Sequence, residues 1–245
     1  MRVILEAGIN HNGSMEAAQK LIDLAYDTGC PYVKFQFYDT ARLFTPEFPF
    51  YHDSERSMLT AEQLSTLFLY ASSKEVIPFA SVFHPDYVPI TEHLRIPIYK
   101  VASCSVRHQE LLEAIAETGK PVILSTGNQK DDAVDRALSI LSRNRVTLLY
   151  CVPKYPARFS DFNFSEVFRM EDRFHREVGL SDHSPDLRAA RAALSMGLPY
   201  LEHHVTLSRT DYPNCDATAS WEPDQLRDFM TEVKEWKSAQ SAKKT

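Results

Sequence analysis

Short apolar runs rich in β-branched residues alternate with longer segments in which apolar residues recur every three to four positions. The short runs predict strands over residues 3–9, 32–37, 78–83, 98–102, 122–126, 146–152, 178–183 and 200–206. The longer segments predict helices over residues 15–27, 61–74, 111–118, 131–142, 185–195 and 223–237. Repeated strand–helix units predict a parallel α/β sheet, and eight of them favour a closed (β/α)8 TIM barrel over an open doubly wound sheet.

The chain length supports one domain. A TIM barrel needs about 250 residues, so a chain of 245 residues predicts a single barrel over residues 1–245. Ser14 is placed to cap the first helix, Gly29 to end it, and Pro223 to begin the last one. The aromatic insertion at 44–57 is longer than a usual strand–helix connection and suggests a lid, whereas the polar tail 238–245 suggests a frayed terminus.

Charge and cysteine content exclude several classes of protein. A formal charge of -6 and a pI near 5.9 argue against a nucleic-acid partner. The chain has no apolar run of the roughly 20 residues that would span a membrane, and its first residues do not resemble a signal peptide. The four cysteines form no C-x-x-C pair, which favours reduced thiols in a cytoplasmic protein.

Polar residues gather where the predicted strands end, which is where TIM-barrel enzymes place their active sites. These residues are Glu6, Asn10, His11, Lys34, Gln36, Lys100, Ser103, Ser125, Thr126, Tyr155, Ser181, Asp182, His183, Glu202, His203 and His204. A single strand-end lysine is more often a surface or salt-bridged residue. Two of them, accompanied by serine hydroxyls, predict a site for a phosphorylated or carboxylated anion.

Two histidines end adjacent strands. A lone histidine is more often structural, but His183 and His204 together predict a site for one divalent metal ion. His203 and His204 alternate, so one of them points away from the barrel axis, and alternation alone does not say which. Four carboxylates are candidates for general acid or base work, and Asp182 and Glu202 are better read as partners of a histidine or lysine. These are Glu6, Asp182, Glu202 and Asp216.

Cys104 and Cys151 also fall near the predicted barrel mouth, where small-residue packing is the preferred interpretation.

Seven segments, in order along the chain, resemble the sialic acid synthase (N-acetylneuraminate synthase) family. They are EAGINHNG at 6–13, VKFQ at 33–36, YKVAS at 99–103, ILSTG at 123–127, the stretch 151–156 that ends in Tyr-Pro, GLSDH at 179–183 and LEHH at 201–204. Each segment alone is weak, but their shared order spans nearly the whole chain. The resemblance implies condensation of phosphoenolpyruvate with a sugar aldehyde, giving a nonulosonic acid and phosphate.

The same resemblance implies roles for individual residues. Phosphoenolpyruvate is expected on Lys34, Lys100, Ser103, Ser125 and Ser181, with Gln36 and Asn10 among the other substrate-binding residues. Manganese, or else Mg2+ or Co2+, is expected on His183 and His204. The expected catalytic residues are Glu6, Asp216 and Tyr155, of which Glu6 and Asp216 would contact the sugar and a metal-bound water.

The chain departs from the family pattern at three places. Ser105 stands where relatives usually carry an acidic residue, and Pro153-Lys154 stands where they carry Asn or Ser before Tyr-Pro. The C-terminal antifreeze-like domain, which supplies an Arg to the partner subunit's site, is not expected within these 245 residues. Two alternatives therefore stay open: another phosphoenolpyruvate-dependent 2-keto-3-deoxy sugar acid synthase, and a catalytically weakened barrel that binds a sugar phosphate or a partner protein. The choice of aldehyde and the presence of a homodimer also stay open.

Overall fold

Eight parallel strands close into a barrel in chain order, with β1 paired to β8. The structure is a computed structural model that describes residues 1–242. All eight predicted strands are confirmed within two residues at each end, as β1 (Arg2–Gly8), β2 (Tyr32–Phe37), β3 (Ile77–Val82), β4 (Tyr99–Val101), β5 (Val122–Ser125), β6 (Val146–Cys151), β7 (Val178–Asp182) and β8 (Tyr200–His204). The TIM barrel expected from the alternation is the observed fold.

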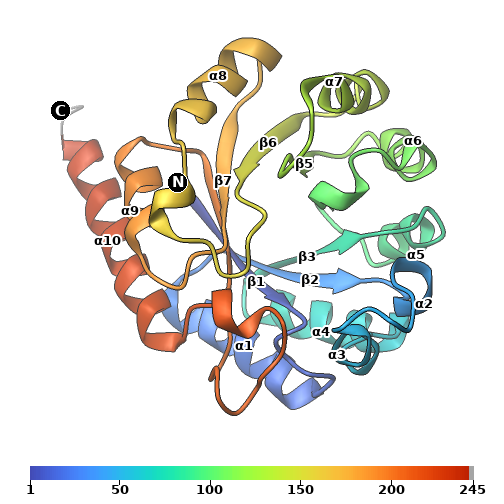
Figure 1. Cartoon of the computed structure of the whole chain (residues 1–245). Helices are drawn as coiled ribbons and strands as arrows, with labels where there is room; N and C mark the ends of the chain where they lie inside the picture. The colour runs from blue at the N-terminus through green and yellow to red at the C-terminus, as the bar shows by residue number, and fades with distance from the viewer. Residues whose placement is uncertain (243–245) are drawn as a thin grey trace.

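The helices form a ring around the strands (Figure 1). The six predicted helices are present as α1 (Met15–Thr28), α4 (Ala61–Ser73), α6 (Gln109–Glu117), α7 (Asp131–Ile140), α9 (Arg188–Ser195) and α10 (Pro223–Ala242). The prediction missed α2 (Thr40–Leu43), α3 (Tyr51–Arg56), α5 (Tyr87–His93) and α8 (Ser165–Phe174). Helices α2, α3 and α5 are short, and Pro89 lies inside α5. Their sequences are therefore too short to show the recurring apolar positions that predict a helix. In α8 the buried Val167, Met170 and Phe174 have helical spacing among charged residues.

The predicted helix boundaries have the expected local chemistry. The Ser14 side chain accepts a hydrogen bond from the Ala17 amide, and Gly29 ends α1 with a φ of 72°. Pro223 is the first residue of α10. The prediction of a frayed tail is wrong for residues 238–242, because α10 continues through them once its first turns pack on the barrel. Residues 243–245 lie outside the described part of the chain.

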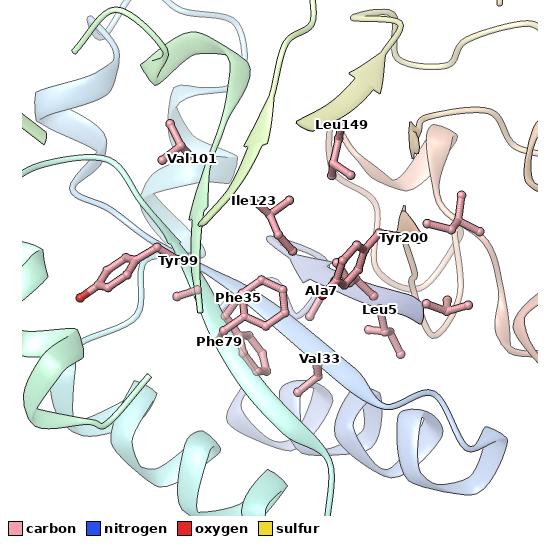
Figure 2. Packing of buried hydrophobic residues seen from close by; sticks show 14 of the residues in the cluster. Leu5, Ala7, Val33, Phe35, Phe79, Tyr99, Val101, Ile123, Leu149 and Tyr200 are labelled. Atoms are coloured by element: carbon pink, nitrogen blue, oxygen red, sulfur yellow. The ribbon is translucent and has the colours of Figure 1, made fainter. Parts of the chain in front are cut away.

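Alternation along the strands separates the core from the barrel mouth. In β2, Val33, Phe35 and Phe37 belong to the hydrophobic core, whereas Lys34 and Gln36 line a cavity inside the barrel. The same core contains helix residues such as Leu64, and Figure 2 shows part of this packing. The period of two thus places polar side chains inside the barrel without exposing the apolar face of the strand.

Gly179 in β7 has no room for a side chain. A Cβ atom there would lie 2.6 Å from the Tyr200 carbonyl oxygen and 2.8 Å from Leu149 Cδ2. Its φ is not in the left-handed region, so alanine would be tolerated by the backbone itself. We therefore expect Gly179→Ala to lower the free energy of unfolding by about 1–3 kcal/mol through overpacking. Urea unfolding measures this, and an unchanged midpoint would contradict the close packing of β7 against β8.

The insertion at 44–57 lies at the barrel mouth and contains α3. The Tyr38 hydroxyl donates a 2.8 Å hydrogen bond to the Ser54 carbonyl oxygen, which ties α3 to the chain that leaves β2. A small buried cluster of Ile9, Tyr38 and Phe83, separate from the main core, packs with Met58 beside this segment. The insertion is therefore anchored at the mouth of the barrel, and its role as a lid stays a prediction.

None of the helices in residues 1–242 has the length and apolar character that crossing a bilayer requires.

Candidate active site

A cavity of about 360 Å³ opens at the carboxyl ends of the strands. Its lining includes most of the predicted site residues, namely Glu6, Lys34, Gln36, Lys100, Ser103, Ser125, Tyr155, Ser181, His183, Glu202 and His204. A larger hollow of about 620 Å³ lies outside the barrel against α4, and its lining contains none of them. Residues that are far apart in the sequence thus meet in one place, as expected for the mouth of a TIM barrel.

The register of the parallel strands places Glu6 and Lys34 side by side. Glu6 of β1 is the Cα partner of Lys34 in β2 and of His204 in β8. The Lys34 ammonium contacts the Glu6 carboxylate and donates a 2.9 Å hydrogen bond to Ser81 Oγ. Ser81 was not among the predicted site residues, although it lies near the carboxyl end of β3, as the predicted residues do in their strands.

Glu202 lies between the two buried lysines. Its Oε2 is 3.6 Å from the Lys34 Nζ and its Oε1 is 3.5 Å from the Lys100 Nζ. Ser181 Oγ donates a 3.1 Å hydrogen bond to the same carboxylate. Burial alone would raise the pKa of Glu202, but the two ammonium groups lower it to about 2. The interpretation of Glu202 as a partner of lysine is confirmed.

The two lysines have pKa values that shift in opposite directions. Burial acts against the charge of both, and for Lys34 the nearby Glu202 and Glu6 outweigh it and raise the pKa. For Lys100 burial prevails, and the pKa is lowered. Lys100 has fewer partners, since among residues 1–242 its Nζ donates only to the Val101 carbonyl oxygen at 3.3 Å besides contacting Glu202. Lys100 is therefore the cation with more capacity for an incoming anion.

Of Glu6 and Glu202, the two carboxylates that line the cavity, Glu6 is the one whose protonation changes near neutral pH. Burial raises its pKa to about 7, against the opposing charge of Lys34. Its Oε1 accepts a 3.2 Å hydrogen bond from Gln36 Nε2. Near pH 7 the floor of the cavity thus holds two lysines, the ionised Glu202 and a partly ionised Glu6. This combination favours an anionic ligand.

Hydroxyl and amide groups from β4 and β5 form another wall of the cavity. Ser103 Oγ accepts a 2.9 Å hydrogen bond from the Gly127 amide, and Gln129 Nε2 donates to the Ser103 carbonyl oxygen at 2.9 Å. Ser125 Oγ is buried and has no hydrogen-bond partner in the described part of the chain. A buried hydroxyl without a partner costs stability, so it is available to a ligand. The prediction did not name Gln129, which lies in the loop beyond β5.

His183 is held in one tautomer by its surroundings. Its Nδ1 lies 3.0 Å from the Val152 carbonyl oxygen, a contact that requires a hydrogen on Nδ1. Burial lowers the pKa of His183 to about 4, so the ring is neutral and Nε2 keeps its lone pair. The Tyr155 hydroxyl lies 2.8 Å from Nε2, and the two rings stack with centroids 4.1 Å apart.

His204 lies beside His183, with 5.5 Å between the ring centroids. Its Nδ1 is buried without a hydrogen-bond partner among the residues that the structure describes, and Asp216 Oδ2 is 3.5 Å away. Burial lowers the pKa of His204 to about 3, which leaves this ring neutral as well. Gly8, with a φ of 50°, leaves the space that both Glu6 and His204 need, since a Cβ there would lie 3.3 Å from His204 Nδ1.

The two imidazoles are compatible with one shared divalent ion. An ion about 2.1 Å from a ring nitrogen lies about 3.2 Å from the ring centroid, so rings sharing an ion are about 4.5–6 Å apart. The observed 5.5 Å between His183 and His204 and the unpartnered His204 Nδ1 agree with this geometry. Within residues 1–242, no three His, Cys, Asp or Glu side chains form a ready ligand set. An ion here would therefore take further ligands from water or substrate.

His203 points away from the cavity, on the side of β8 opposite to His204. Its ring is buried and stacks on Trp221, with centroids 3.7 Å apart and an interplanar angle of 18°. Asp182 Oδ1 accepts a 2.8 Å hydrogen bond from the Ser184 amide, and its Oδ2 is 3.7 Å from His203 Nε2. Asp182 thus accompanies a histidine, as the sequence interpretation preferred.

Two predicted residues lie away from the cavity lining. Asn10 is fully buried in the loop after β1, where its Nδ2 donates to the Val205 carbonyl oxygen at 3.0 Å and to Ser220 Oγ at 2.8 Å. Asn10 therefore lies outside the cavity lining, where its amide ties two loops together, and its role in substrate binding stays a prediction. Asp216 lies beside the site, with its Oδ2 3.5 Å from His204 Nδ1.

The structure also shows where the residues lie that depart from the family pattern, and where the two cysteines near the barrel mouth lie. Ser105 is buried in the turn after β4 and does not line the cavity, whereas the neighbouring Cys104 is exposed and does. Cys151 also lines the cavity, and burial raises the pKa of its thiol to about 11, in agreement with the packing interpretation. Pro153 lines the cavity, but Lys154 is turned to Asp161, with 2.5 Å between Nζ and Oδ1.

Several known proteins are similar to this chain in sequence and in fold. The chain is 30% identical to N,N'-diacetyllegionaminic acid synthase of Campylobacter jejuni, over 97% of this chain and 76% of that protein. It is 27% identical to human N-acetylneuraminate-9-phosphate synthase, over 95% of this chain and 69% of that protein. The crystal structure of a Leptospira borgpetersenii sialic acid synthetase in complex with citrate superposes with a TM-score of 0.92 at 29% identity, covering 97% of this chain and 84% of that one.

A model of one family covers most of the chain. The NeuB family model matches residues 21–245, and the part of the chain before it carries β1 with Glu6. The barrel, the polar ring at the strand ends and these similarities agree with one another, and the chain belongs to the NeuB family.

Proposed function

We propose that this barrel condenses phosphoenolpyruvate with an open-chain sugar aldehyde to give a nonulosonic acid and inorganic phosphate. The observation that carries the proposal is the single cavity holding two buried lysines beside two neutral histidines. The names of the relatives, which are synthases of legionaminic acid and of N-acetylneuraminate 9-phosphate, support the product class. An N-acetylmannosamine-like aldehyde is the default acceptor.

Phosphoenolpyruvate would be held by charge and hydroxyl groups at the cavity floor. Lys34 and Lys100 offer positive charge to its carboxylate and phosphate, and the unpartnered Ser125 hydroxyl can donate to an oxygen. Ser103 and Ser181 lie on the same lining. Because Ser103 Oγ already accepts from the Gly127 amide, its hydrogen is free to point toward the ligand.

The aldehyde would lie nearer the two histidines. A divalent ion held by His183 and His204, with Asp216 beside them, would supply Lewis-acid polarisation of the aldehyde carbonyl. Mn2+ is the expected ion, and Mg2+ or Co2+ would serve the same chemistry. The Tyr155 hydroxyl donates to His183 Nε2 in this structure, so it would turn away from that nitrogen when an ion binds there and could then donate to a sugar oxygen.

In the reaction, C3 of phosphoenolpyruvate forms a bond to the aldehyde carbon, and C2 becomes cationic. The π electrons of the aldehyde carbonyl pass to its oxygen, which takes a proton from water and becomes a hydroxyl of the product. Water then adds to C2, and ionised Glu6 accepts a proton from that water at its carboxylate oxygen. Cleavage of the C2–O bond releases phosphate and leaves a 2-keto-3-deoxy sugar acid. Lys34 and Lys100 would keep the departing phosphate and the carboxylate neutralised throughout.

Replacing Lys100 by alanine is expected to raise the KM for phosphoenolpyruvate about ten- to a hundred-fold, since a hydrogen bond to a charged group contributes about 1.5–3 kcal/mol. The effect on kcat should be smaller, because the lysine binds the ligand before and during the reaction. Lys34→Ala should act in the same direction and also destabilise the fold, since it leaves Glu6 without its cation. Steady-state kinetics with varied phosphoenolpyruvate measures both effects, and unchanged KM values would remove these lysines from the site.

One assay tests the proposal as a whole. Purified protein is incubated with phosphoenolpyruvate, Mn2+ and a panel of sugar aldehydes, and phosphate release is followed. We expect release that needs both the ion and an aldehyde, with 18O from the bridging C–O–P position ending in phosphate. Release without an aldehyde would identify a phosphatase. Ligand binding without any release would favour a weakened barrel.

A further inference from the structure

His203 connects the ends of the two strands that carry the paired histidines. Its Nε2 lies 2.9 Å from the Ser184 carbonyl oxygen, which belongs to the residue directly after His183. Its Nδ1 lies 2.7 Å from the carbonyl oxygen of His204. A neutral imidazole carries one N–H, so His203 can donate to only one of these oxygens. The His204 carbonyl oxygen already accepts from the Trp221 amide, so we place the hydrogen on Nε2, which donates it to the Ser184 carbonyl oxygen across the two strand ends.

Trp221 packs against the face of the His203 ring. The indole stacks against His203 with 3.7 Å between the ring centroids, and the Trp221 amide donates to the His204 carbonyl oxygen at 2.9 Å. The Trp221 carbonyl oxygen accepts from the Thr206 amide at 2.9 Å, which binds this residue to the end of β8. With 1% of its surface exposed, His203 has no freedom to leave these contacts without opening the barrel wall.

This arrangement differs from ordinary packing. An apolar side chain would fill the same space against Trp221, but it would leave the Ser184 carbonyl oxygen without this partner. The separation of His183 and His204 depends on how the ends of β7 and β8 lie, and the direct pairing of these strands stops at Asp182 and His203. Beyond that point, the His203 ring provides a hydrogen-bond contact between the two strand ends.

We propose that His203 is a positioning residue, whose hydrogen bond to the Ser184 carbonyl oxygen and stacking on Trp221 set the separation of the metal-binding imidazoles of His183 and His204. This inference rests on the proposed function, because it takes the two histidines to be ligands of a divalent ion. Groups that orient metal ligands from behind typically change metal affinity about 10–100-fold when they are replaced.

The test compares His203→Phe with wild type, using Co2+ as the probe ion. Phenylalanine keeps a ring against Trp221 and removes both nitrogen contacts. We expect Co2+ affinity, measured by titration calorimetry, to fall about 10–100-fold, with an altered visible Co2+ spectrum. Metal-free binding of phosphoenolpyruvate should be unchanged, because Lys34 and Lys100 do not contact His203.

Two further variants keep the comparison decisive. Val233→Ala, in the buried face of α10, lowers stability away from the site and should leave Co2+ affinity and spectrum unchanged. His203→Gln retains an amide that can donate to a carbonyl oxygen, so we expect it to recover part of the lost affinity. If His203→Phe does not fold, the glutamine variant decides: weaker Co2+ binding with an altered spectrum supports the proposal, and wild-type binding overturns it.

The outcomes separate this inference from the proposed function. Wild-type Co2+ affinity and spectrum in a folded His203→Phe protein would overturn the positioning role while leaving the synthase proposal intact. Absence of Co2+ and Mn2+ binding in the wild type would instead refute the metal site of the proposed function, and the positioning role with it.

Discussion

Replacing either His183 or His204 by alanine is expected to abolish metal-dependent turnover while the barrel stays folded. The two imidazoles are neutral above about pH 5, because burial lowers their pKa values to about 4 and about 3. Both are therefore ready to donate a lone pair at neutral pH without losing a proton. With no third side chain gathered into a ready ligand set in residues 1–242, loss of one imidazole leaves too few protein ligands for the ion.

The measurement is phosphate release with saturating Mn2+, together with circular dichroism to show that each variant is folded. His93→Ala, an exposed histidine in α5, is the matched control and should retain wild-type turnover. Ion binding should weaken as the pH falls through about 4, where His183 becomes protonated. Full activity of either site variant in the presence of a chelator would refute the assignment of these histidines as ligands.

Glu6→Gln should lower kcat about a hundred- to ten-thousand-fold, the usual contribution of a general acid or base. Glutamine keeps an oxygen for the hydrogen bond from Gln36, but it cannot accept a proton. In the wild type, kcat should rise as the pH increases through about 7, because burial raises the Glu6 pKa to that value and the ionised form is the base. The variant should lose this limb of the pH profile.

Ser105→Ala is the control for Glu6→Gln. Ser105 occupies the position where an acid is expected from the family pattern, but it is buried and does not line the cavity, so its loss should change kcat little. The dissociation constant of phosphoenolpyruvate, measured separately, shows whether the altered charge beside Lys34 affects binding as well. A severe loss of kcat in Ser105→Ala, together with nearly normal kcat in Glu6→Gln, would refute the role of Glu6 as the base and indicate that Ser105 takes part in catalysis.

The eight strands and six of the helices can be predicted from the sequence because both signals are local. A strand alternates with period two and a helix repeats near 3.6, and neither pattern requires knowledge of a distant residue. Eight such units in a chain of 245 residues favour closure into one barrel. Closure then brings all the strand ends together, so a polar residue at the end of any strand is a candidate for the same site.

The partners of these residues depend on tertiary structure. Glu202 is a polar residue at a strand end in the sequence, but its ionised state follows from its position between Lys34 and Lys100, which come from β2 and β4. The raised pKa of Glu6 depends on burial, which no local pattern reports. Charges interact through space, and their partners are set by strand register and barrel closure.

Which side chains point into the cavity also depends on closure of the barrel. Alternation shows that His203 and His204 face opposite sides, but only closure of β8 against β1 and β7 turns His204 inward and His203 toward Trp221. Asn10 satisfies the strand-end rule and still misses the cavity, because a loop follows the packing of its neighbours and not a strand period. Local periodicity thus identifies the strands and the candidate residues, while long-range packing selects those that face the cavity.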